Sequence, residues 1–534
     1  MHQPFRNTRA IAALTGAAVL ITSAVVSAQY QGPSSSKTPY ILPVLPVVKT
    51  ASILTVGDSI GGYRMVGIPD GLGAFDNGDG TFTVLMNHEL GSALGTVRAH
   101  GSRGAFVSKW IIDKSTMTVL SGSDLMQHVY LWDTATQKSF AAPATFAFQR
   151  FCSGDLPAVT AFYNPVSGLG TQERLYMHGE EGGPGNQVAT VVTGPSARNA
   201  YVLGKFNLST NGSGMTGVGS WENALASPFP QDKTVVVANS DGGTGLHANA
   251  VSVYVGTKQS TGSEAEKAGL MNGTLTFVNV AGNPVEIVNN TTRATNITSG
   301  TRFSLSGTAS TTFSRPEDGA WDAFDPNVYY FVTTDRLDTL SDGVGTQIGQ
   351  TRLWRLTFDD ITNPALGGTI DLVIDGRTVD GKKVNMFDNI GVNTTTGQIV
   401  LVEDVGGAAH NGKTWLYDPA TDVLTMVARH DPARFGDIGV PATAPYNNDE
   451  EASGVLDVSS ILGAGSYIVD TQAHYGTGDP ETVEGGQLML LHIPLPVAAA
   501  KDACKSGGFD WHFRADGSAF KNQGDCIQYV NTGK

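Results

Sequence analysis

Short apolar or alternating runs, separated by turn sequences, recur along most of this chain and limit the folds open to it. The runs lie at residues 81–86, 234–238, 252–255, 328–333, 352–356, 398–402, 414–417 and 466–469. Asn211-Gly212 and Asn411-Gly412 are strong turn signals because Asn and Gly adopt positive φ at low cost. No long helical period competes with this pattern, so the sequence predicts antiparallel β-sheet.

The strand pattern continues over roughly 400 residues without a break in composition that would divide it into domains. Only 16% of the 534 residues are charged, and Gly, Ser, Thr and Asn are abundant, which favours turns and short strands over long helices. A β-propeller accommodates one large body because it adds blades radially, which favours it over a sandwich. We therefore predict an all-β protein with a β-propeller over residues 50–499.

The N-terminus has the pattern of a secretory signal peptide at residues 1–28. Arg6 and Arg9 precede an apolar run at residues 10–26, and Ser27-Ala28 offers small residues for cleavage. The run is short and ends in small and polar residues, which favours cleavage over a retained membrane anchor. We expect a mature protein without a membrane span that is secreted, periplasmic or held at the cell surface.

Two further segments flank the predicted propeller. Residues 29–49 contain four prolines and several serines, which is typical of an extended linker. Residues 500–534 contain Cys504 and Cys526 between Gly-rich turns, and we expect these cysteines to pair and to staple a small C-terminal module. Cys152 is then unpaired, and it is either a buried inert thiol or a thiolate ligand or nucleophile.

The net charge of −15 is spread along the chain, which makes nucleic acid an unsuitable partner. Clustered carboxylates repel one another unless they are protonated or bridged by cations, and Ca²⁺ takes six to eight oxygen ligands. Dispersed acidic residues that only keep an exported protein soluble are the simpler interpretation.

Acidic residues end several of the predicted strands. They are Glu89 after residues 84–88, Glu180 and Glu181 after 175–179, Glu403 and Asp404 after 399–402, and Asp470 after 467–469. A single polar strand end is common, but several that converge at one channel mouth require compensating charge.

A second group lies at residues 314–322, where Arg315 is followed by Glu317 and Asp318. The arginine fork fits phosphate oxygens, and the carboxylates could hold a cation beneath them. A local ion pair at a sheet edge is the alternative. A third acidic group, at residues 447–454, could equally be a solvated loop.

Together these segments, in this order, resemble the PhoX-type bacterial alkaline phosphatase family. The matching segments are Asn87-His88-Glu89, Phe151-Cys152-Ser153-Gly154, Gly179-Glu180-Glu181, Arg315-Pro316-Glu317-Asp318, Asp388-Asn389, Glu451-Ala452-Ser453-Gly454 and Asp470-Thr471-Gln472-Ala473-His474. The resemblance spans residues 60–495. It implies six blades, a cofactor of Fe³⁺ and Ca²⁺ with a bridging oxo or hydroxo nucleophile, and hydrolysis of phosphomonoesters.

The resemblance also implies roles for individual residues. Cys152 would bind iron, and Arg315 would be catalytic by stabilising the equatorial oxygens of the transferring phosphoryl group. The expected oxygen ligands are Glu89, Glu181, Glu317, Asp388, Glu403, Glu451 and Asp470. We expect a monomer that acts on a small-molecule phosphomonoester. The alternatives are a calcium-stabilised surface propeller without catalysis and a propeller hydrolase of the phytase or phosphodiesterase kind.

Overall fold

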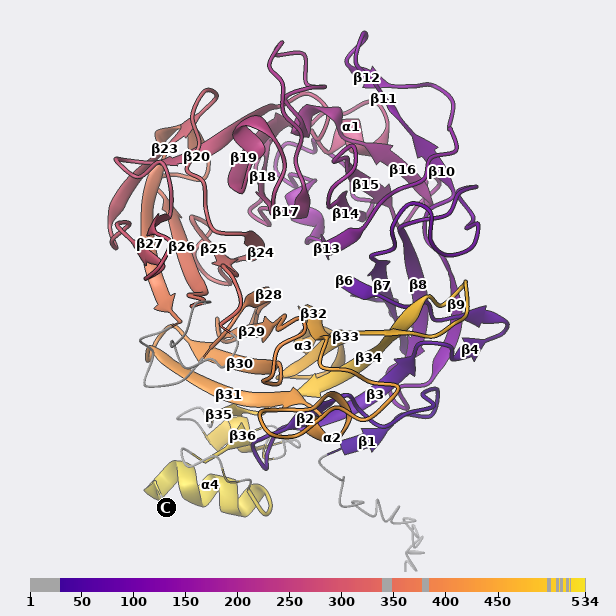
Figure 1. The fold of residues 1–534 in the computed structure, drawn as a ribbon, viewed down its shortest axis with the longest axis vertical. Coiled ribbons are helices and arrows are strands. Elements are labelled where there is room, and N and C mark those ends of the chain that lie inside the picture. The colour runs from indigo at the N-terminus through magenta and orange to yellow at the C-terminus, as the bar shows by residue number, and fades with distance from the viewer. Residues whose placement is uncertain are drawn as a thin grey trace, which may run out of the picture.

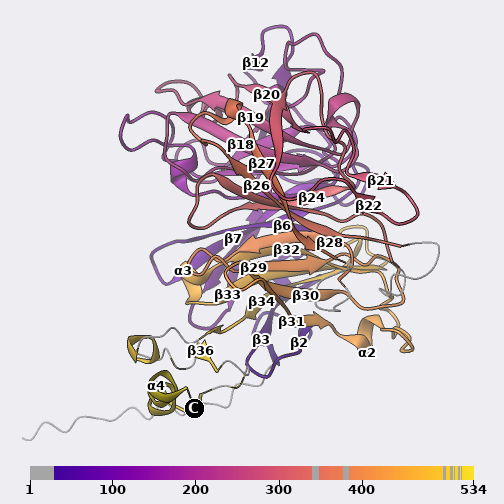
Figure 2. The same ribbon diagram turned by 90° about the vertical axis from the view of Figure 1, so that its left-hand side faces the viewer.

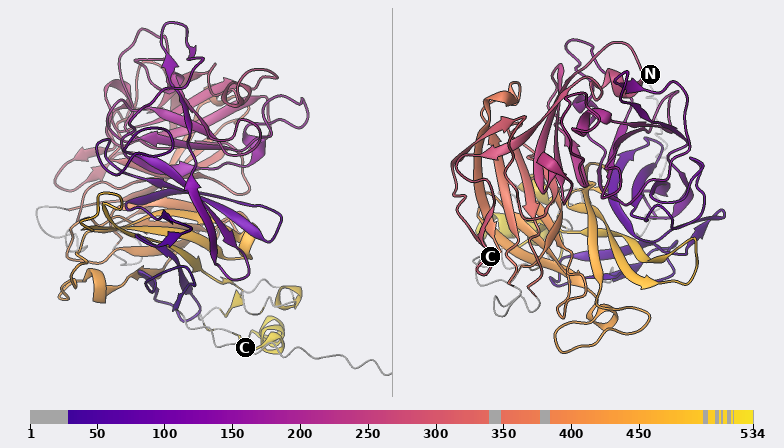
Figure 3. Two further views of the ribbon diagram at one scale, coloured as in Figure 1. Left: turned by 90° about the vertical axis from the view of Figure 1, so that its right-hand side faces the viewer. Right: turned by 45° about the horizontal axis from the view of Figure 1, so that its top comes forward.

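The computed structural model describes residues 29–338, 348–376, 384–496, 501–505, 509, 512–514, 518 and 520–533. The predicted signal peptide lies outside the described residues. The sheets are arranged radially around one axis, as the face view in Figure 1 and the tilted view in Figure 3 show. The chain is therefore an all-β propeller, as the strand pattern predicts.

Six four-stranded antiparallel blades form the ring. The strands of blades one to three are β6 (Pro69–Asp76), β7 (Thr81–His88), β8 (Phe106–Asp113) and β9 (Val119–Asp124); β13 (Phe151–Asp155), β14 (Leu175–Glu180), β15 (Gln187–Val191) and β16 (Asn199–Val202); and β17 (Trp221–Ala226), β18 (Lys233–Ser240), β19 (Ala250–Thr257) and β20 (Thr274–Val280).

The strands of blades four to six are β24 (Pro316–Trp321), β25 (Val328–Thr333), β26 (Arg352–Phe358) and β27 (Gly368–Asp375); β28 (Phe387–Val392), β29 (Ile399–Glu403), β30 (Lys413–Asp418) and β31 (Val423–His430); and β32 (Glu450–Asp457), β33 (Ser466–Gly476), β34 (Glu484–His492) and β3 (Lys49–Thr55). The first strand of each blade faces the centre (Figure 1). Each of these inner strands contacts the inner strands of both neighbouring blades, so the ring is closed.

The N-terminal segment closes the ring. Strand β3 pairs with β34 and so supplies the outermost strand of blade six from the other end of the chain. The segment at residues 29–49 is not the free linker that its prolines suggest. Its strand β1 (Gln29–Gln31) pairs with β3, and β2 (Ile41–Pro43) adds a fifth strand to blade five beside β31. Pro43 is tolerated within β2 because this strand lies at the edge of its sheet.

Blades three and four are joined into one nine-stranded sheet. Strand β23 (Thr301–Ser306) pairs with β20 on one side and with β27 on the other. The two outermost strands, which would otherwise have free edges, are therefore hydrogen-bonded to a common partner.

Buried apolar side chains fill the interfaces between neighbouring blades. All six residues of β25 are buried, because both faces of its blade pack against other sheets. One cluster joins Val253 of blade three to Phe331 of blade four, and another joins Leu353 of blade four to Leu401 of blade five. Each buried side chain of this size contributes about 1.5–3 kcal/mol. The interfaces therefore hold the inner strands in place.

Short helices and two-stranded sheets accompany the blades and the C-terminal segment. The helices are α1 (Glu264–Lys267), α2 (Pro432–Phe435), α3 (Ser459–Leu462) and α4 (Gln523–Thr532). The two-stranded sheets are β4 (Ser59–Ile60) with β5 (Tyr63–Arg64), β11 (Trp132–Asp133) with β12 (Lys138–Ser139), β21 (Ile287–Asn289) with β22 (Ala294–Thr295), and β35 (Leu495–Pro496) with β36 (His512–Phe513). In blade two, β10 (His128–Tyr130) adds to β16. In the described part of the chain, no helix combines the length and apolar character needed to cross a membrane.

The C-terminal module lies beside the ring (Figure 2). The predicted disulfide between Cys504 and Cys526 is confirmed, and both cysteines are buried with Phe520 in a small cluster of their own. The module contains helix α4, whose first turn is capped by the Asn522 side chain.

Replacing both cysteines of this pair with serine is expected to unfold the module and to leave the propeller intact. The disulfide spans 22 residues, and a closed loop of that size stabilises the folded state by about 3 kcal/mol. A cluster as small as this one cannot replace that contribution. Limited proteolysis would then cut only after about residue 496. Cleavage throughout the blades would contradict the prediction.

Candidate metal centre

Each inner strand carries a possible metal ligand at its second residue. The six residues are Asp70 in β6, Cys152 in β13, Glu222 in β17, Glu317 in β24, Asp388 in β28 and Glu451 in β32. Each inner strand also has a bulge or irregularity in its pairing with the second strand of its blade. A bulge re-aims the side chains beside it. All six residues line one cavity of about 150 Å³, which we call the acidic cavity.

A second set of carboxylates comes from the residues that follow the second strands. They are Glu89 after β7, Glu181 after β14, Asp241 after β18 and Asp404 after β29. The backbone N–H of Glu89 donates to the Ile68 carbonyl at 2.9 Å, and that of Asp404 donates to the Met386 carbonyl at 3.0 Å. Equivalent positions of different blades are therefore held in the same way, and all four carboxylates line the acidic cavity.

Two arginines lie over these carboxylates. Arg150 and Arg315 each immediately precede an inner strand, and both have positive φ, 41° and 58°. Ile68 and Met386, which precede the inner strands of blades one and five, also have positive φ, 51° and 46°, so this costly conformation recurs at the start of inner strands. Arg150 Nη1 lies 2.9 Å from Glu181 Oε2, while Arg315 Nε donates to Asp241 and its Nη2 lies 2.9 Å from Glu317. Both side chains are about 40% exposed and remain accessible from outside.

Gln472 and His474, on β33, contact carboxylates that line the acidic cavity. The Gln472 amide donates to Asp70, Glu89 and Glu451 at 3.0–3.2 Å. His474 lies 2.7 Å from Glu484 and 3.7 Å from Glu451. Burial opposes its charged form, but hydrogen bonds to these two glutamates raise the pKa of His474 to about 11. This histidine is therefore a cation beside Glu451, one of the carboxylates of the acidic cavity.

The acidic cavity holds far more negative than positive charge. Nine carboxylates line it, together with one thiol and only two guanidinium groups. Burial, followed by the charge of Glu451, raises the pKa of Glu89 to about 8 and that of Asp404 to about 7. Burial also raises the pKa of Glu222 and Glu317 well above the usual range. Bound cations would remove the need for these groups to hold protons near neutral pH.

The donor atoms are close enough to share cations. Three overlapping groups have ligand atoms within 4.8 Å of one another, and they are Asp70 with Glu89 and Cys152, Cys152 with Glu181 and Glu222, and Glu222 with Glu317 and Asp388. Cys152 belongs to the first two groups, and Glu222 joins the last two. The all-oxygen group suits Ca²⁺, whereas the thiol suits a transition metal such as iron. The residues present thus fit a centre with several metal ions.

The side chain of Cys152 faces the acidic cavity rather than the core of a blade. Its Sγ lies 3.2 Å from Glu181 Oε2, to which it donates a hydrogen bond. Burial, followed by the charge of Glu222, raises the pKa of the thiol well above its usual range. A thiol in this environment requires a metal ion to become a thiolate.

The structure brings seven of the nine predicted site residues to the acidic cavity. These are Arg315, Cys152, Glu89, Glu181, Glu317, Asp388 and Glu451. Of the pair Glu180 and Glu181, only Glu181 lines the cavity. The Glu180 carboxylate accepts hydrogen bonds from the backbone of Gln149 and from Asn186.

Glu403 and Asp470 are placed elsewhere, which corrects their expected role. Glu403 Oε1 accepts from Trp415 Nε1 at 2.8 Å and from the backbone of Asn385, inside blade five. Asp470 accepts from the backbone of Gly454 at 2.7 Å. Because successive residues of a strand face opposite sides, the residue after Glu403, Asp404, lines the cavity instead.

Five residues of the acidic cavity are absent from the predicted ligands and catalytic residues, although Asp404 is among the acidic strand ends that the sequence indicates. They are Asp70, Arg150, Glu222, Asp241 and Asp404. A shared signal exists, because most of the inner strands begin with an apolar residue followed by a carboxylate or thiol, as in Pro69-Asp70, Trp221-Glu222 and Pro316-Glu317. This two-residue pattern becomes informative only once the inner strands are known.

Comparisons with known proteins give no family for the chain. No protein-family model and no curated protein sequence matches it. Similar solved structures include the PQQ-bound aldose sugar dehydrogenase from Streptomyces coelicolor, with 11% identity, a TM-score of 0.32 and coverage of 84% of this chain and 99% of that one. A protein of unknown function from Dyadobacter fermentans has 7% identity, a TM-score of 0.39 and coverage of 84% and 100%. At these scores the likenesses carry no argument about activity.

Proposed function

We propose that this chain is an exported, metal-dependent phosphomonoester hydrolase resembling the PhoX-type alkaline phosphatases. The observation that supports it is the convergence of nine carboxylates, one thiol and two accessible arginines on one cavity. In a scaffold that only binds calcium, the two arginines would compete with the cations for the same carboxylates. In a phosphate-binding centre the arginines have a function, because one guanidinium group can bind two phosphoryl oxygens at once.

We assign the metals by donor chemistry. Cys152, with Glu181 and Glu222, would hold Fe³⁺, and the oxygen-only group of Glu222, Glu317 and Asp388 would hold Ca²⁺. When bound, such ions supply charge neutralisation and an activated oxygen nucleophile.

The protein's own residues would bind and orient the phosphoryl group. Arg150 pairs with Glu181, Arg315 pairs with Glu317 and Asp241, and the charges of both arginines act on Glu181. A phosphoryl group placed between them would exchange these ion pairs for contacts with its equatorial oxygens. His474, held as a cation by Glu484, adds positive charge beside Glu451.

The size of the cavity favours a broad range of small monoesters. Its volume of about 150 Å³ is below the roughly 300 Å³ at which sites that enclose small molecules begin. Only the phosphoryl group would be enclosed, and the rest of the ester would stay outside.

The test is hydrolysis of a chromogenic phosphomonoester by the purified protein, together with its elemental analysis. We expect iron and calcium in the protein, and turnover that a chelator abolishes. Faster hydrolysis of a phosphodiester or of inositol phosphate would favour the phytase or phosphodiesterase alternative. Absence of turnover with every metal supplied would favour the calcium-braced scaffold.

Replacing Arg150 with glutamine is expected to reduce kcat/KM as much as replacing Arg315, by about 10–100-fold each, because a hydrogen bond to a charged group contributes about 1.5–3 kcal/mol. Inhibition by inorganic phosphate should weaken in the same proportion. Arg355→Gln is the matched control, since Arg355 pairs with Asp371 on an outer strand. An Arg150 variant with unchanged phosphate inhibition would contradict the assignment.

A further inference from the structure

A second cavity opens at the other end of the inner strands. Its volume is about 260 Å³, and residues from the inner strands of all six blades line it. We call it the far cavity. The two cavities share no lining residue, although Ser153, Asp318 and Asn389 of the far cavity directly follow Cys152, Glu317 and Asp388 of the acidic cavity.

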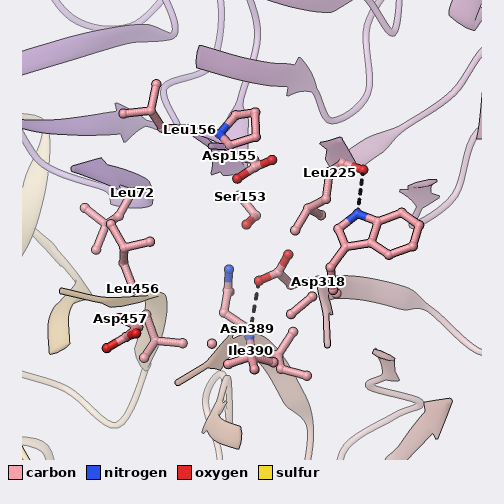
Figure 4. A pocket seen from close by; sticks show the side chains of 18 of the residues that line it. Leu72, Ser153, Asp155, Leu156, Leu225, Asp318, Asn389, Ile390, Leu456 and Asp457 are labelled. Atoms are coloured by element: carbon pink, nitrogen blue, oxygen red, sulfur yellow. Dashed lines mark hydrogen bonds between the residues drawn. The ribbon is translucent and has the colours of Figure 1, made fainter. Parts of the chain in front are cut away.

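The floor of the far cavity is polar. Ser153, Asp155, Asp318 and Asn389 face its centre, and Figure 4 shows the Asn389 amide pointing into the open space between Ser153 and Asp318. Asn389 is only 1% exposed, yet neither its Nδ2 nor its Oδ1 has a hydrogen-bond partner among the described residues. A buried carboxamide left without partners costs about 1–3 kcal/mol. This is the expected state of a group that binds a ligand.

The charge of the floor is negative and unbalanced. Asp318 accepts from the Ile390 backbone at 3.2 Å and from Asn223, but no Lys or Arg is among the lining residues. Burial raises the pKa of Asp155 to about 8. A cation in contact with the Asp155 and Asp318 carboxylates would neutralise their charge at this floor.

The walls of the far cavity are apolar. The side chains above the floor are Leu72, Leu156, Leu225, Ile390, Val455 and Leu456, and Figure 4 shows most of them around the polar centre. Ca²⁺ takes six to eight oxygen ligands, and the apolar side chains of these walls supply none of them. A primary ammonium has three donors. The carboxylates of Asp155 and Asp318 and the Asn389 amide oxygen supply three acceptors.

We propose that the far cavity binds a primary ammonium ion carried on a short apolar group. The ammonium would lie on Asp155, Asp318 and Asn389, and the apolar group would lie against the leucine walls. This site is separate from the metal centre and does not depend on the proposed phosphatase activity.

The test is calorimetric titration of the purified, metal-loaded protein with n-butylammonium at alkaline pH. For a ligand of this size we expect a Kd of about 1 mM. Asp155→Asn and Asn389→Leu should each weaken binding at least about tenfold. Ala158→Trp, at an exposed position on the cavity wall, should block binding without disturbing the core.

Two matched controls locate the bound ion. Asp457 lies on the rim of the far cavity but is bonded to Thr394, and Asp404 belongs to the acidic cavity. Asp457→Asn and Asp404→Asn should therefore bind n-butylammonium as the unmodified protein does. Equal binding of n-butanol, competition by Ca²⁺ alone, loss of binding in the Asp404 variant, or no binding at all would each overturn the proposal.

Discussion

Glu317→Gln is expected to reduce phosphomonoesterase activity by roughly 10³-fold, equivalent to about 4 kcal/mol of transition-state stabilisation. Glu317 is 1% exposed and contacts Arg315 at 2.9 Å. It also belongs to the all-oxygen group with Glu222 and Asp388. The amide keeps the size of the side chain but removes the charge that the cation and the arginine both require. Steady-state kinetics and calcium content measure the two consequences.

Cys152→Ala should cause a loss of similar size together with loss of iron, because Cys152 is shared by two of the three ligand groups. Glu180→Gln is the matched control for both variants. Glu180 is buried beside Glu181, but its hydrogen bonds are to Gln149 and Asn186 rather than to the cavity. We expect the activity of the Glu180→Gln variant to stay within about twofold of that of the unmodified protein. Full activity in the Cys152 variant would refute the assigned role of the thiol.

Removal of the metals is expected to destabilise the protein increasingly as the pH rises. The pKa of Glu89 is raised to about 8 and that of Asp404 to about 7. A carboxyl with a raised pKa in the folded state stabilises that state fully only below its unfolded pKa, and this contribution is lost as the pH rises through the folded pKa. In the metal-free protein the loss therefore falls between about pH 5 and about pH 8, at up to about 1.4 kcal/mol per pH unit for each of these two groups.

The measurement is the melting temperature of chelator-treated and metal-loaded protein at about pH 5 and about pH 8. In the loaded protein the carboxylates are ionised as ligands, so the loss does not occur. The difference between the two forms should widen by roughly 5 °C over this range. Groups outside the acidic cavity, such as Lys258 with its lowered pKa, titrate in both forms of the protein. Their effect on the melting temperature is therefore the same in both forms and does not change the difference. A constant difference would show that the carboxylates are not the metal ligands.

Several features of the fold follow from local sequence. The Val-rich and aromatic runs of β18 and β25 are strands because both faces of each blade are buried. The pairing of Cys504 with Cys526 follows from their proximity in one tail. Arg315 and Glu317 are neighbours in both sequence and structure, so their pairing could be predicted from the residues alone.

The linker prediction shows where local reasoning fails. Prolines and serines at residues 29–49 indicate an extended chain, and the chain is indeed extended. Only the closed ring, however, offers the free strand edges of blades five and six on which β1, β2 and β3 pair. A partner that lies hundreds of residues away leaves no local signal.

The chain's residue order thus sets which segments become strands and which residues can bind metals, because both depend on side-chain chemistry and short-range periodicity. The ring of blades decides which of those residues meet. Asp404 rather than Glu403, and Glu181 rather than Glu180, line the acidic cavity. Glu222 and Asp241 join them from blade three, in which no motif marks the site. The physical reason is that strand pairing and the bulges of the inner strands set the direction of each side chain, and both arise only when six distant segments close around one axis.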